Sequence, residues 1–459
     1  MSPIARDLSE YVCEDDEARF PPLARSRAVD AVTDCVGCMM AGSREPLAER
    51  IARTLAAAGS GQGSVMAGRA SSASATDAAL YNGAAAHALD YDDTNHPAYA
   101  HPSAVLVPAL LGAAALGPLS GRELITAYLI GFEVFGKLGR ALNTAHYRRG
   151  WHATATFGTL AAAASVARAL RLDRPQTVAA LGIAASAAGG LRANFGSMVK
   201  PLHAGYAARN GLLAALLARE GHDASDHALE HDYGFFKLFA GDGGYDPQPL
   251  HSWGEPLEIL TPYGLALKPY PSCGATHTGI EAALEIRARV GGAVPDRVVA
   301  GVSELHFAPL IHVQPARGLE GKFSLHFCLA VALLEGELNL ASFSQDRVDN
   351  PRIRSLIERT IMEVDPSVGD GAEFPTRVRV WLAGGRTEEC FIPLAQGKPE
   401  RWFSPEQMRR KFDDCLRGFV PQAADALFAS LRGLDDAMTL SEPGALLSRL
   451  RACAPASSH

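Results

Sequence analysis

The spacing of hydrophobic and polar residues predicts a helical first half of the chain. Up to about residue 262, apolar residues recur at helical spacing, and capping residues or prolines precede several of these runs. Helices are expected at these places: from 21–22, from Pro46, after Thr76 or Asp77, over 120–142, over 160–170 after Thr154 or Thr156, over 176–191 and over 203–220. We therefore expect residues 1–262 to form an all-helical domain.

The pattern changes after about residue 263. The segment 297–307 is rich in β-branched residues, and the segment 377–392 alternates on both sides of a Gly-Gly turn, which is typical of a hairpin. Helical patterns lie between these strands and return after residue 404: 276–290, 324–334, 353–364, 405–416, 421–431 and 443–450. The predicted fold class is mainly α, with residues 1–262 and 404–459 in a large all-helical domain and residues 263–403 in a smaller inserted α+β domain. The tail from residue 454 is expected to be disordered.

Composition and charge narrow the class of protein. With 47% hydrophobic and 20% charged residues, the 459-residue chain is expected to be globular. The net charge of −7 argues against nucleic acid as a partner, because such binding needs a basic surface. No signal-peptide pattern opens the chain, and its apolar runs are broken by proline and glycine, so we expect neither secretion nor a membrane span.

The eight cysteines are too few in so long a chain for a disulfide framework. Cys35 and Cys38 form a C-x-x-C pair, but no second pair or nearby histidine completes a zinc site. We expect these two thiols to pack in the core and the protein to be cytoplasmic.

Lysine is rare in this sequence, with seven lysines against 36 arginines. Where arginine is the default surface cation, a retained lysine is a candidate for chemistry, because buried lysine shifts its pKa readily and arginine does not. The seven are Lys137, Lys200, Lys237, Lys268, Lys322, Lys398 and Lys411.

The segment 87–103 contains three aspartates and three histidines, and Pro97 and Pro102 stiffen its loop. Such a cluster can supply a general base with an orienting carboxylate. Alternatively, Asp90, Asp92 and Asp93 cap and solvate a helix end. His87, on the preceding helix, is interpreted as a packed histidine.

His152 precedes a predicted helix in the segment 150–158. A helix N-terminus offers free N–H groups and positive potential, which suit a carboxylate ligand, and a histidine there can exchange a proton with it. The alternative is a loop histidine bonded to backbone.

Two lysines of the shortlist stand beside prolines. Lys200 precedes Pro201 in the segment 192–205, and Lys268 precedes Pro269 in the segment 267–277, near the predicted domain boundary. We expect both to be placed by rigid loops; the alternative is a surface lysine whose stem covers apolar neighbours. Lys137, Lys237, Lys398 and Lys411 attach to no motif and are expected to be solvated, and Lys322 stays undecided.

These four segments together resemble the MmgE/PrpD family, which includes 2-methylcitrate dehydratase, cis-aconitate decarboxylase and iminodisuccinate epimerase. The matching stretches are HALDYDDTNHPAYAHPS, GWHATATFGT, ANFGSMVKPLHAGYAARNGL and KPYPSCGATH, in the family's order. The resemblance implies a helical domain, a smaller α+β domain, an active site between them, a homodimer, and no required metal or organic cofactor.

The resemblance also implies roles for individual residues. His101 and His152 become candidates for proton transfer, with Asp90 orienting or sharing a proton, and Thr94 belongs to the same group. Lys200 and Lys268 would hold substrate carboxylates and offset developing charge. His277, in the fourth segment, is a candidate substrate contact.

One position departs from the family pattern. Several members carry a tyrosine where this chain has Phe327, in the segment 321–327. If that phenol donates a proton in those enzymes, this chain must use another donor, and His326 and Tyr270 are candidates. The first segment also lacks the longer tryptophan-containing loop associated with dedicated methylcitrate dehydratases.

The function predicted first is a cofactor-independent lyase that removes a proton beside a carboxylate of a small di- or tricarboxylic acid, as a 2-methylcitrate dehydratase does. Decarboxylation of cis-aconitate and an iminodisuccinate-type epimerisation are alternatives on the same site. Two remoter alternatives are a magnesium-dependent prenyl diphosphate enzyme, with Asp90, Asp92 and Asp93 as ligands, and a non-catalytic helical scaffold that binds anions.

Overall fold

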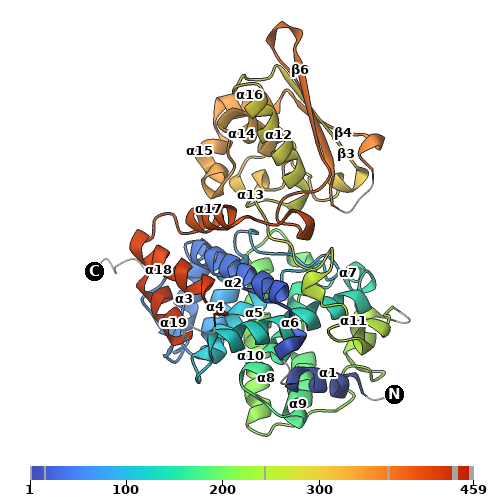
Figure 1. Cartoon of the computed structure of the whole chain (residues 1–459), viewed down its shortest axis with the longest axis vertical. Coiled ribbons are helices and arrows are strands. Elements are labelled where there is room, and N and C mark those ends of the chain that lie inside the picture. Colours follow the sequence, from blue (N-terminus) through green and yellow to red (C-terminus); the bar gives the residue numbers. More distant parts are fainter. Residues whose placement is uncertain (1–2, 15–16, 242–243, 370–372, 437–442, 454–459) are drawn as a thin grey trace. The chain divides into compact units, whose positions relative to one another are not determined.

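The computed structural model of the chain describes residues 3–14, 17–241, 244–369, 373–436 and 443–453. The chain divides into two compact units, Met1–Leu267 with Ser404–His459, and Lys268–Phe403. The domain expected from the sequence ended at residue 262, whereas the first unit continues to Leu267. The mainly α fold class with a smaller α+β part is confirmed (Figure 1). The predicted disordered tail, 454–459, lies outside the described residues.

The first unit consists almost entirely of helices. One two-stranded ribbon, β1 (Ser64–Val65) with β2 (Ser72–Ala73), was not predicted. The helices are α1 (Ile4–Cys13), α2 (Pro22–Gly42), α3 (Pro46–Ala57), α4 (Ala75–His87), α5 (Ser103–Ala114), α6 (Gly121–Leu142), α7 (Ala145–Arg148), α8 (Ala153–Ala169), α9 (Arg174–Ala187), α10 (Val199–Arg219), α11 (Phe235–Ala240), α17 (Pro405–Cys415), α18 (Pro421–Arg432) and α19 (Pro443–Ala452).

Glycines let helices α4 and α10 approach closely enough to bring two candidate segments together. A Cβ atom on Gly205 would lie 2.2 Å from the carbonyl oxygen of Leu80, and one on Gly83 would lie 2.9 Å from Cα of Gly205. No larger residue fits at this crossing without moving the backbone. The crossing holds the last turn of α4, with His87, beside the first turn of α10, with Lys200.

The C-terminal helices close the first unit. Helices α17 and α18 pack against α2, and α19 packs against α5. Helix α17 begins at Pro405, as expected from the sequence, and Ser404 caps it in a capping box with Gln407. Thus helices that begin at Pro405 and Pro421 cover the helix that begins at Pro22.

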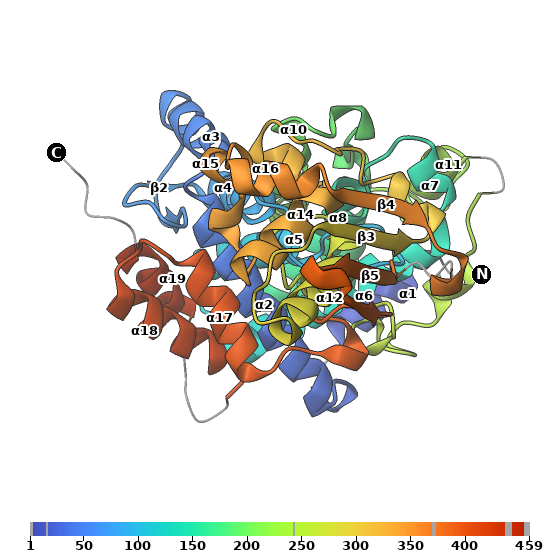
Figure 2. The ribbon, with the colours of Figure 1, turned by 90° about the horizontal axis from the view of Figure 1, so that it is seen from above.

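The second unit is a four-stranded sheet with helices packed on it. The strand order is β4 (Thr360–Val364), β3 (Arg297–Val302), β5 (Thr376–Trp381) and β6 (Thr387–Ile392), with β3–β4 parallel and the other pairs antiparallel. Helix α12 (His277–Arg289) packs on β5, β6 and α14 (Leu325–Glu335). Figure 2 shows α12 and α14 against the strands of this unit. The shorter helices α13 (Gly318–Gly321), α15 (Gln345–Val348) and α16 (Pro351–Ile357) complete it.

Three local predictions were wrong. The segment 353–364 is not one helix, because α16 ends at Ile357 and the β-branched run that follows pairs with β3 as β4. Helix α8 begins at Ala153 with His152 as its N-terminal cap residue, ahead of Thr154 and Thr156. Helix α10 begins at Val199, so Lys200 lies in its first turn and not in a rigid loop.

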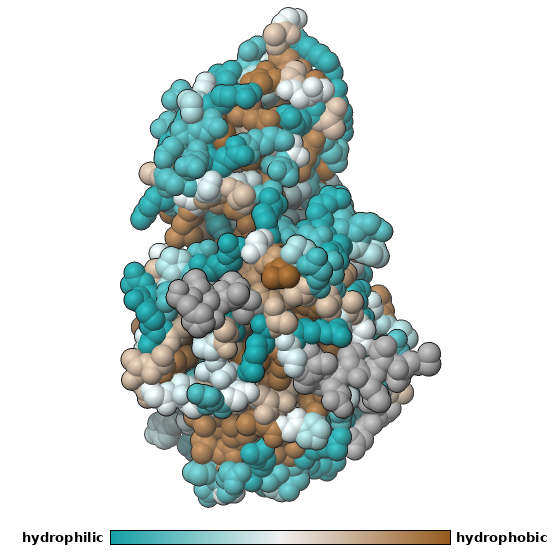
Figure 3. Space-filling view, turned by 90° about the vertical axis from the view of Figure 1, so that its left-hand side faces the viewer, coloured by the Kyte–Doolittle hydropathy of each residue, from teal (hydrophilic) through white to brown (hydrophobic). Residues whose placement is uncertain are grey.

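The surface of the chain mixes polar and apolar areas. Figure 3 shows one face, on which hydrophobic atoms gather in patches between hydrophilic ones. Within the described ranges, no helix combines the length and the apolar character that crossing a bilayer requires.

Candidate active site

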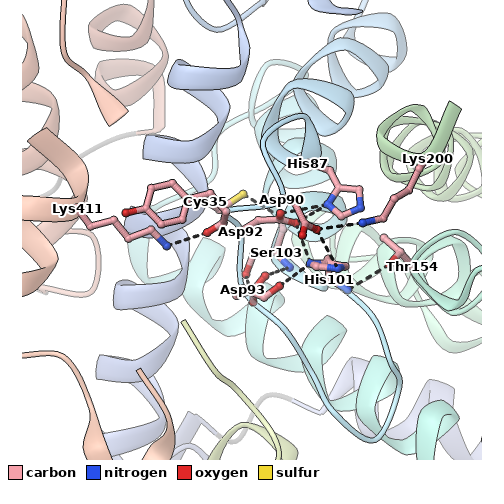
Figure 4. A network of polar contacts seen from close by, with 11 residues as sticks. Cys35, His87, Asp90, Asp92, Asp93, His101, Ser103, Thr154, Lys200 and Lys411 are labelled. Atoms are coloured by element: carbon pink, nitrogen blue, oxygen red, sulfur yellow. Dashed lines mark hydrogen bonds and ion pairs between the residues drawn. The ribbon is translucent and has the colours of Figure 1, made fainter. Parts of the chain in front are cut away.

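A sharp turn after α4 presents the aspartate cluster. Asp90 has a φ of 54°, a left-handed backbone conformation that aspartate tolerates better than most residues. The turn buries Asp92 and Asp93 completely, while the side chain of Asp90 keeps 15% of its surface exposed. Figure 4 shows the three carboxylates between Lys411 on one side and Lys200 on the other. The interpretation of these aspartates as a solvated helix end therefore fails for Asp92 and Asp93.

His101 is oriented by the turn. Its Nδ1 lies 2.9 Å from the carbonyl oxygen of Asp93 and 3.3 Å from Oδ2 of Asp92. Because both neighbours are acceptors, Nδ1 carries the proton and donates it. In the neutral ring, Nε2 then keeps a lone pair, 4.0 Å from Oδ1 of Asp90. This is the geometry of a histidine base held by a buried carboxylate.

Asp92 is shared by two histidines. His87 Nδ1 donates to Asp92 Oδ2 at 2.9 Å, and the rings of His87 and His101 lie 4.3 Å apart. Burial acts to raise the pKa of Asp92, but the two histidines outweigh it and hold that pKa well below its ordinary value. Burial lowers the pKa of His87 to about 4 despite Asp92, so His87 is neutral at pH 7. His87 is thus packed, as predicted, and also belongs to the polar network.

Lys200 brings a cation to the same place. Its Nζ donates to Oδ1 of Asp90 at 3.0 Å, and the side chain keeps 21% of its surface exposed. Asp90 Oδ1 therefore lies near both Lys200 and the Nε2 of His101. The ammonium group of Lys200 is thus paired but still partly exposed, so that a carboxylate ligand can contact it.

His152 lies in the same region but is more deeply buried. Its backbone N–H donates to the carbonyl oxygen of Gly190 at 2.9 Å, and its ring lies 6.1 Å from that of His87. Burial, helped by the nearby His87 and Lys200, holds the pKa of His152 well below its ordinary value. His152 is therefore neutral at pH 7. The ring of His152 does not cap α8. Its Nδ1 faces another histidine, His203, so the interpretation of His152 as a loop histidine whose ring bonds to backbone is not supported.

Thr94 and Asp93 connect the turn to the rest of the unit. Thr94 and Ala266 exchange backbone hydrogen bonds of 2.8 and 2.9 Å. Asp93 accepts from the backbone N–H and the hydroxyl of Ser103, which starts α5. Burial, followed by the charges of Asp92 and Asp34, raises the pKa of Asp93 to about 8 although Ser103 acts against it. Asp93 is therefore protonated at neutral pH and serves the scaffold.

The four groups at the turn can also be considered as metal ligands. His87, Asp90, Asp92 and His101 offer ligand atoms within 4.8 Å of one another, a mixed set that suits a transition metal better than magnesium. The two carboxylates already have protein partners, however: Asp92 accepts from both histidines and Asp90 from Lys200. A metal ion bound there would have to displace these partners.

The remaining candidates lie in the second unit. Lys268 is 6% exposed in an extended segment, and half-buried Tyr270 packs edge-on against His277, whose Nε2 donates to the carbonyl oxygen of Ser272. The backbone N–H of Cys273 donates to the carbonyl oxygen of Lys322 at 2.9 Å. That bond brings the segment 268–277 beside 321–327. His326 is 6% exposed, and Phe327 is fully buried in the apolar core.

Two lysines expected to be solvated are buried in the first unit. Lys411 is 5% exposed and lies 2.5 Å from Asp34 Oδ1, and Lys137 is 2% exposed and lies 3.6 Å from Glu133. Both predictions were wrong because the lysines lie on helix faces that other helices cover. Lys237, by contrast, is 47% exposed, and Lys398 pairs with Glu373.

One residue that the sequence analysis passed over joins the site. His203 faces His152, with 3.0 Å between their Nδ1 atoms. The available signal was its spacing: His203 stands three residues after Lys200, and such residues share a face once α10 is known to begin at Val199.

Comparisons with known proteins confirm the family that the sequence resembles. Residues 6–248 match the MmgE/PrpD N-terminal domain and residues 270–432 match the MmgE/PrpD C-terminal domain. The chain belongs to the MmgE/PrpD family. It is 31% identical to the cis-aconitate decarboxylase of Homo sapiens over 80% of this chain and 78% of that protein. It is 30% identical to the enzyme of the same name from Mus musculus, over 73% and 71%, and 28% identical to a cis-aconitate decarboxylase-like protein of Aspergillus oryzae, over 97% of both.

Proposed function

We propose that this protein is a lyase acting on a small di- or tricarboxylic acid, and that decarboxylation of cis-aconitate is its reaction. The single observation that carries the proposal is the meeting of Lys200, Asp90 and His101 at one partly exposed point. A cation for a carboxylate and a histidine for a proton are what such a substrate needs. The cis-aconitate decarboxylases among the relatives favour this acid over others.

In the proposed reaction, the bond between the methylene carbon of cis-aconitate and its carboxylate breaks and CO₂ leaves. The electron pair of that bond forms a new double bond between the methylene carbon and the central carbon, and the pair of the original double bond moves to its far carbon. The carbon at its far end then takes a proton, and the product is itaconate. The developing charge beside the remaining carboxylates must be offset by fixed cations and donors, and losing one such donor typically costs about 3–4 kcal/mol.

Each residue has a role in this proposal. Lys200 binds a substrate carboxylate, which displaces part of its interaction with Asp90. His101, with Nδ1 fixed by Asp92 and Asp93, presents Nε2 for proton transfer at carbon. His152, neutral and buried, is the second proton carrier, and Thr94 is a candidate contact. From the family resemblance alone, Lys268, Tyr270, His277 and His326 are proposed to contact substrate.

The test uses the full chain after treatment with EDTA. The protein is incubated with cis-aconitate, citrate and 2-methylcitrate, and products are followed by proton NMR and CO₂ release. Itaconate with equimolar CO₂ from cis-aconitate supports the proposal. His96→Gln is the matched control, since His96 lies on the same loop but packs against Tyr99 and Tyr263. No turnover of any of the three acids by the parent protein would refute it.

Dehydration of 2-methylcitrate, the reaction predicted first from the sequence, is the second candidate. The lone pair on His101 Nε2 favours it, because dehydration starts with removal of a proton beside a carboxylate and ends with loss of hydroxide. A water-loss product from 2-methylcitrate without CO₂ would support this reaction. Deuterium uptake from solvent with no net product would instead support epimerisation.

We also propose that the protein is a cytoplasmic homodimer, as the family resemblance implies. Helix α10 carries the exposed apolar side chains Tyr206 and Leu213, and its N-terminal cap residue Met198 is exposed as well. Such side chains are typical of a surface that another chain covers. Light scattering coupled to size exclusion tests this point, with Leu213→Asp as the variant expected to weaken a dimer.

A further inference from the structure

Two histidines of the first unit share one proton. The Nδ1 atoms of His152 and His203 lie 3.0 Å apart, and the two residues are only 2% and 4% exposed. Two nitrogens at that distance form a hydrogen bond only when one carries the proton and the other does not. The tautomers of the two rings are therefore coupled.

The surroundings hold both rings neutral. Burial is the main cause that lowers the pKa of each, and His87, Lys200 and His101 lower that of His152 further. A second proton between the rings would place two cations in contact beside Lys200. The pair therefore carries a single bridging proton.

The outer nitrogens of the two rings remain available. Among the described residues, the buried ring nitrogens without a partner are Nε2 of His87 and Nδ1 of His146; the Nε2 atoms of His152 and His203 are not among them. The structure gives neither Nε2 a hydrogen-bond partner within the described ranges, and neither atom is among the fully buried ones. Water or a ligand can therefore reach each Nε2.

We propose that His203 is a positioning residue that relays protons to His152. The inference rests on the proposed function, in which the Nε2 of His152 delivers a proton to the substrate carbon. When His203 donates through Nδ1, the neutral ring of His152 must carry its own proton on Nε2. When His152 donates through Nδ1, its Nε2 bears a lone pair. The direction of one hydrogen bond thus sets whether His152 acts as acid or base.

The two rings are neutral at the start and at the end of the relay. His152 gives its Nε2 proton to the substrate, the bridging proton moves from His203 Nδ1 to His152 Nδ1, and a water molecule protonates His203 Nε2 and leaves as hydroxide into the solvent. Both rings end neutral with their tautomers exchanged. Running the same steps backwards removes a proton from a substrate, so the pair serves either direction of transfer.

The backbone around the pair keeps the rings in place. Gly190, with a φ of 139°, accepts from the backbone N–H of His152, and a Cβ on it would lie 2.7 Å from Ala155 and 3.6 Å from the ring of His203. Phe195 packs edge-on against His152 at 4.8 Å. His203 itself is fixed on α10, one helical turn after Lys200.

The first test needs no substrate. Protein labelled with ¹⁵N in its histidines is compared with His203→Phe by NMR, with His152→Asn used for assignment. We expect a scalar coupling between the two Nδ1 nuclei across the hydrogen bond in the parent, and its loss together with a changed tautomer of His152 in His203→Phe. Identical His152 signals in both proteins would overturn the proposal even if the enzyme is active.

The second test is kinetic. His203→Ala is expected to lower kcat by about tenfold or more, at the low end for general acid–base catalysis, with KM nearly unchanged. Added imidazole is expected to restore kcat in His203→Ala and to leave His96→Ala unaffected, which a merely structural role would not produce. A kcat within twofold of the parent, or no rescue by imidazole, overturns the relay. If the parent acts on none of the acids, the proposed function fails and the NMR comparison alone decides on the pair.

Discussion

Lys411 donates a hydrogen bond of 2.8 Å to the carbonyl oxygen of Tyr91, the residue between Asp90 and Asp92. Its ammonium lies 4.1 Å from the centre of the Tyr91 ring and 2.5 Å from Asp34 on α2. Lys411, on helix α17, therefore holds the turn that carries Asp92, the carboxylate that orients His101. A buried ion pair thus lies directly behind the turn that carries Asp90 and Asp92.

Removing this lysine is expected to damage both stability and activity. Lys411→Met leaves the buried carboxylate of Asp34 unpaired, which typically costs about 3–5 kcal/mol. Lys411→Met with Asp34→Asn is expected to recover most of that loss, because no buried charge then lacks a partner. Urea unfolding of the parent, both single variants and the double variant measures the coupling. A double variant as unstable as Lys411→Met would contradict this account.

The same variants separate stability from positioning. In the double variant, the Tyr91 carbonyl has lost its donor although the charge balance is kept. We expect a reduced kcat at a temperature where the protein remains fully folded, as judged by circular dichroism. An unchanged kcat would show that the turn is held by its other contacts.

Sequence reasoning found the parts of the site that local chemistry marks. Prolines and capping residues predicted the starts of α2, α3, α6 and α17, and the motif resemblance pointed to Asp90, His101, His152 and Lys200. It failed for Lys411 and His203, since their importance comes from which helix face is covered. That information depends on the packing of α17 on α2 and of α10 on α8, which lie far apart in sequence.

Asp90 is expected to control how Lys200 and His101 respond to substrate. In Asp90→Asn, Lys200 loses its carboxylate partner and the charge beside His101 Nε2 disappears. We expect kcat to fall by about 10²-fold or more, as for other groups that support acid–base catalysis. Steady-state kinetics with cis-aconitate measure this effect. A loss confined to KM would assign Asp90 to binding alone.

The buried Asp93 makes stability depend on pH. Its pKa is raised to about 8, above that of an aspartate in the unfolded chain, so the folded state retains a proton that the unfolded state releases. This contribution to stability is complete below about pH 4, the pKa of the unfolded aspartate, and is lost as pH rises toward 8. Each pH unit in that window removes up to about 1.4 kcal/mol.

Asp93→Asn tests this assignment, because an amide accepts from the Ser103 backbone N–H and can donate to its hydroxyl. The variant is expected to be more stable than the parent at pH 8 and to show a flatter dependence of Tm between pH 5 and 8. Asp34 and Glu133, whose pKa values burial raises to about 6 and about 7, act in the same direction in both proteins. The difference between parent and variant therefore isolates Asp93. Parallel curves would contradict the raised pKa.

Removal of metal is expected to leave activity intact. Asp90 already accepts from Lys200 and Asp92 from both histidines, so a divalent cation would have to displace these protein partners. Activity after EDTA, and after later addition of Mg²⁺, Mn²⁺ or Zn²⁺, measures the requirement. A strict need for magnesium would revive the prenyl diphosphate alternative.

Replacing Phe327 by the tyrosine that several family members carry is expected to destabilise the protein. Its side chain is fully buried in the core of the second unit, 5.7 Å from the ring of Phe343. A hydroxyl added there and left without a partner typically costs about 1–3 kcal/mol. We therefore expect Phe327→Tyr to lower the midpoint of urea unfolding without raising kcat. Phe343→Tyr, at a ring that is 8% exposed, is the control expected to cost less. A more active Phe327→Tyr would instead mean that the new phenol reaches substrate, and that this chain has lost a proton donor at that position.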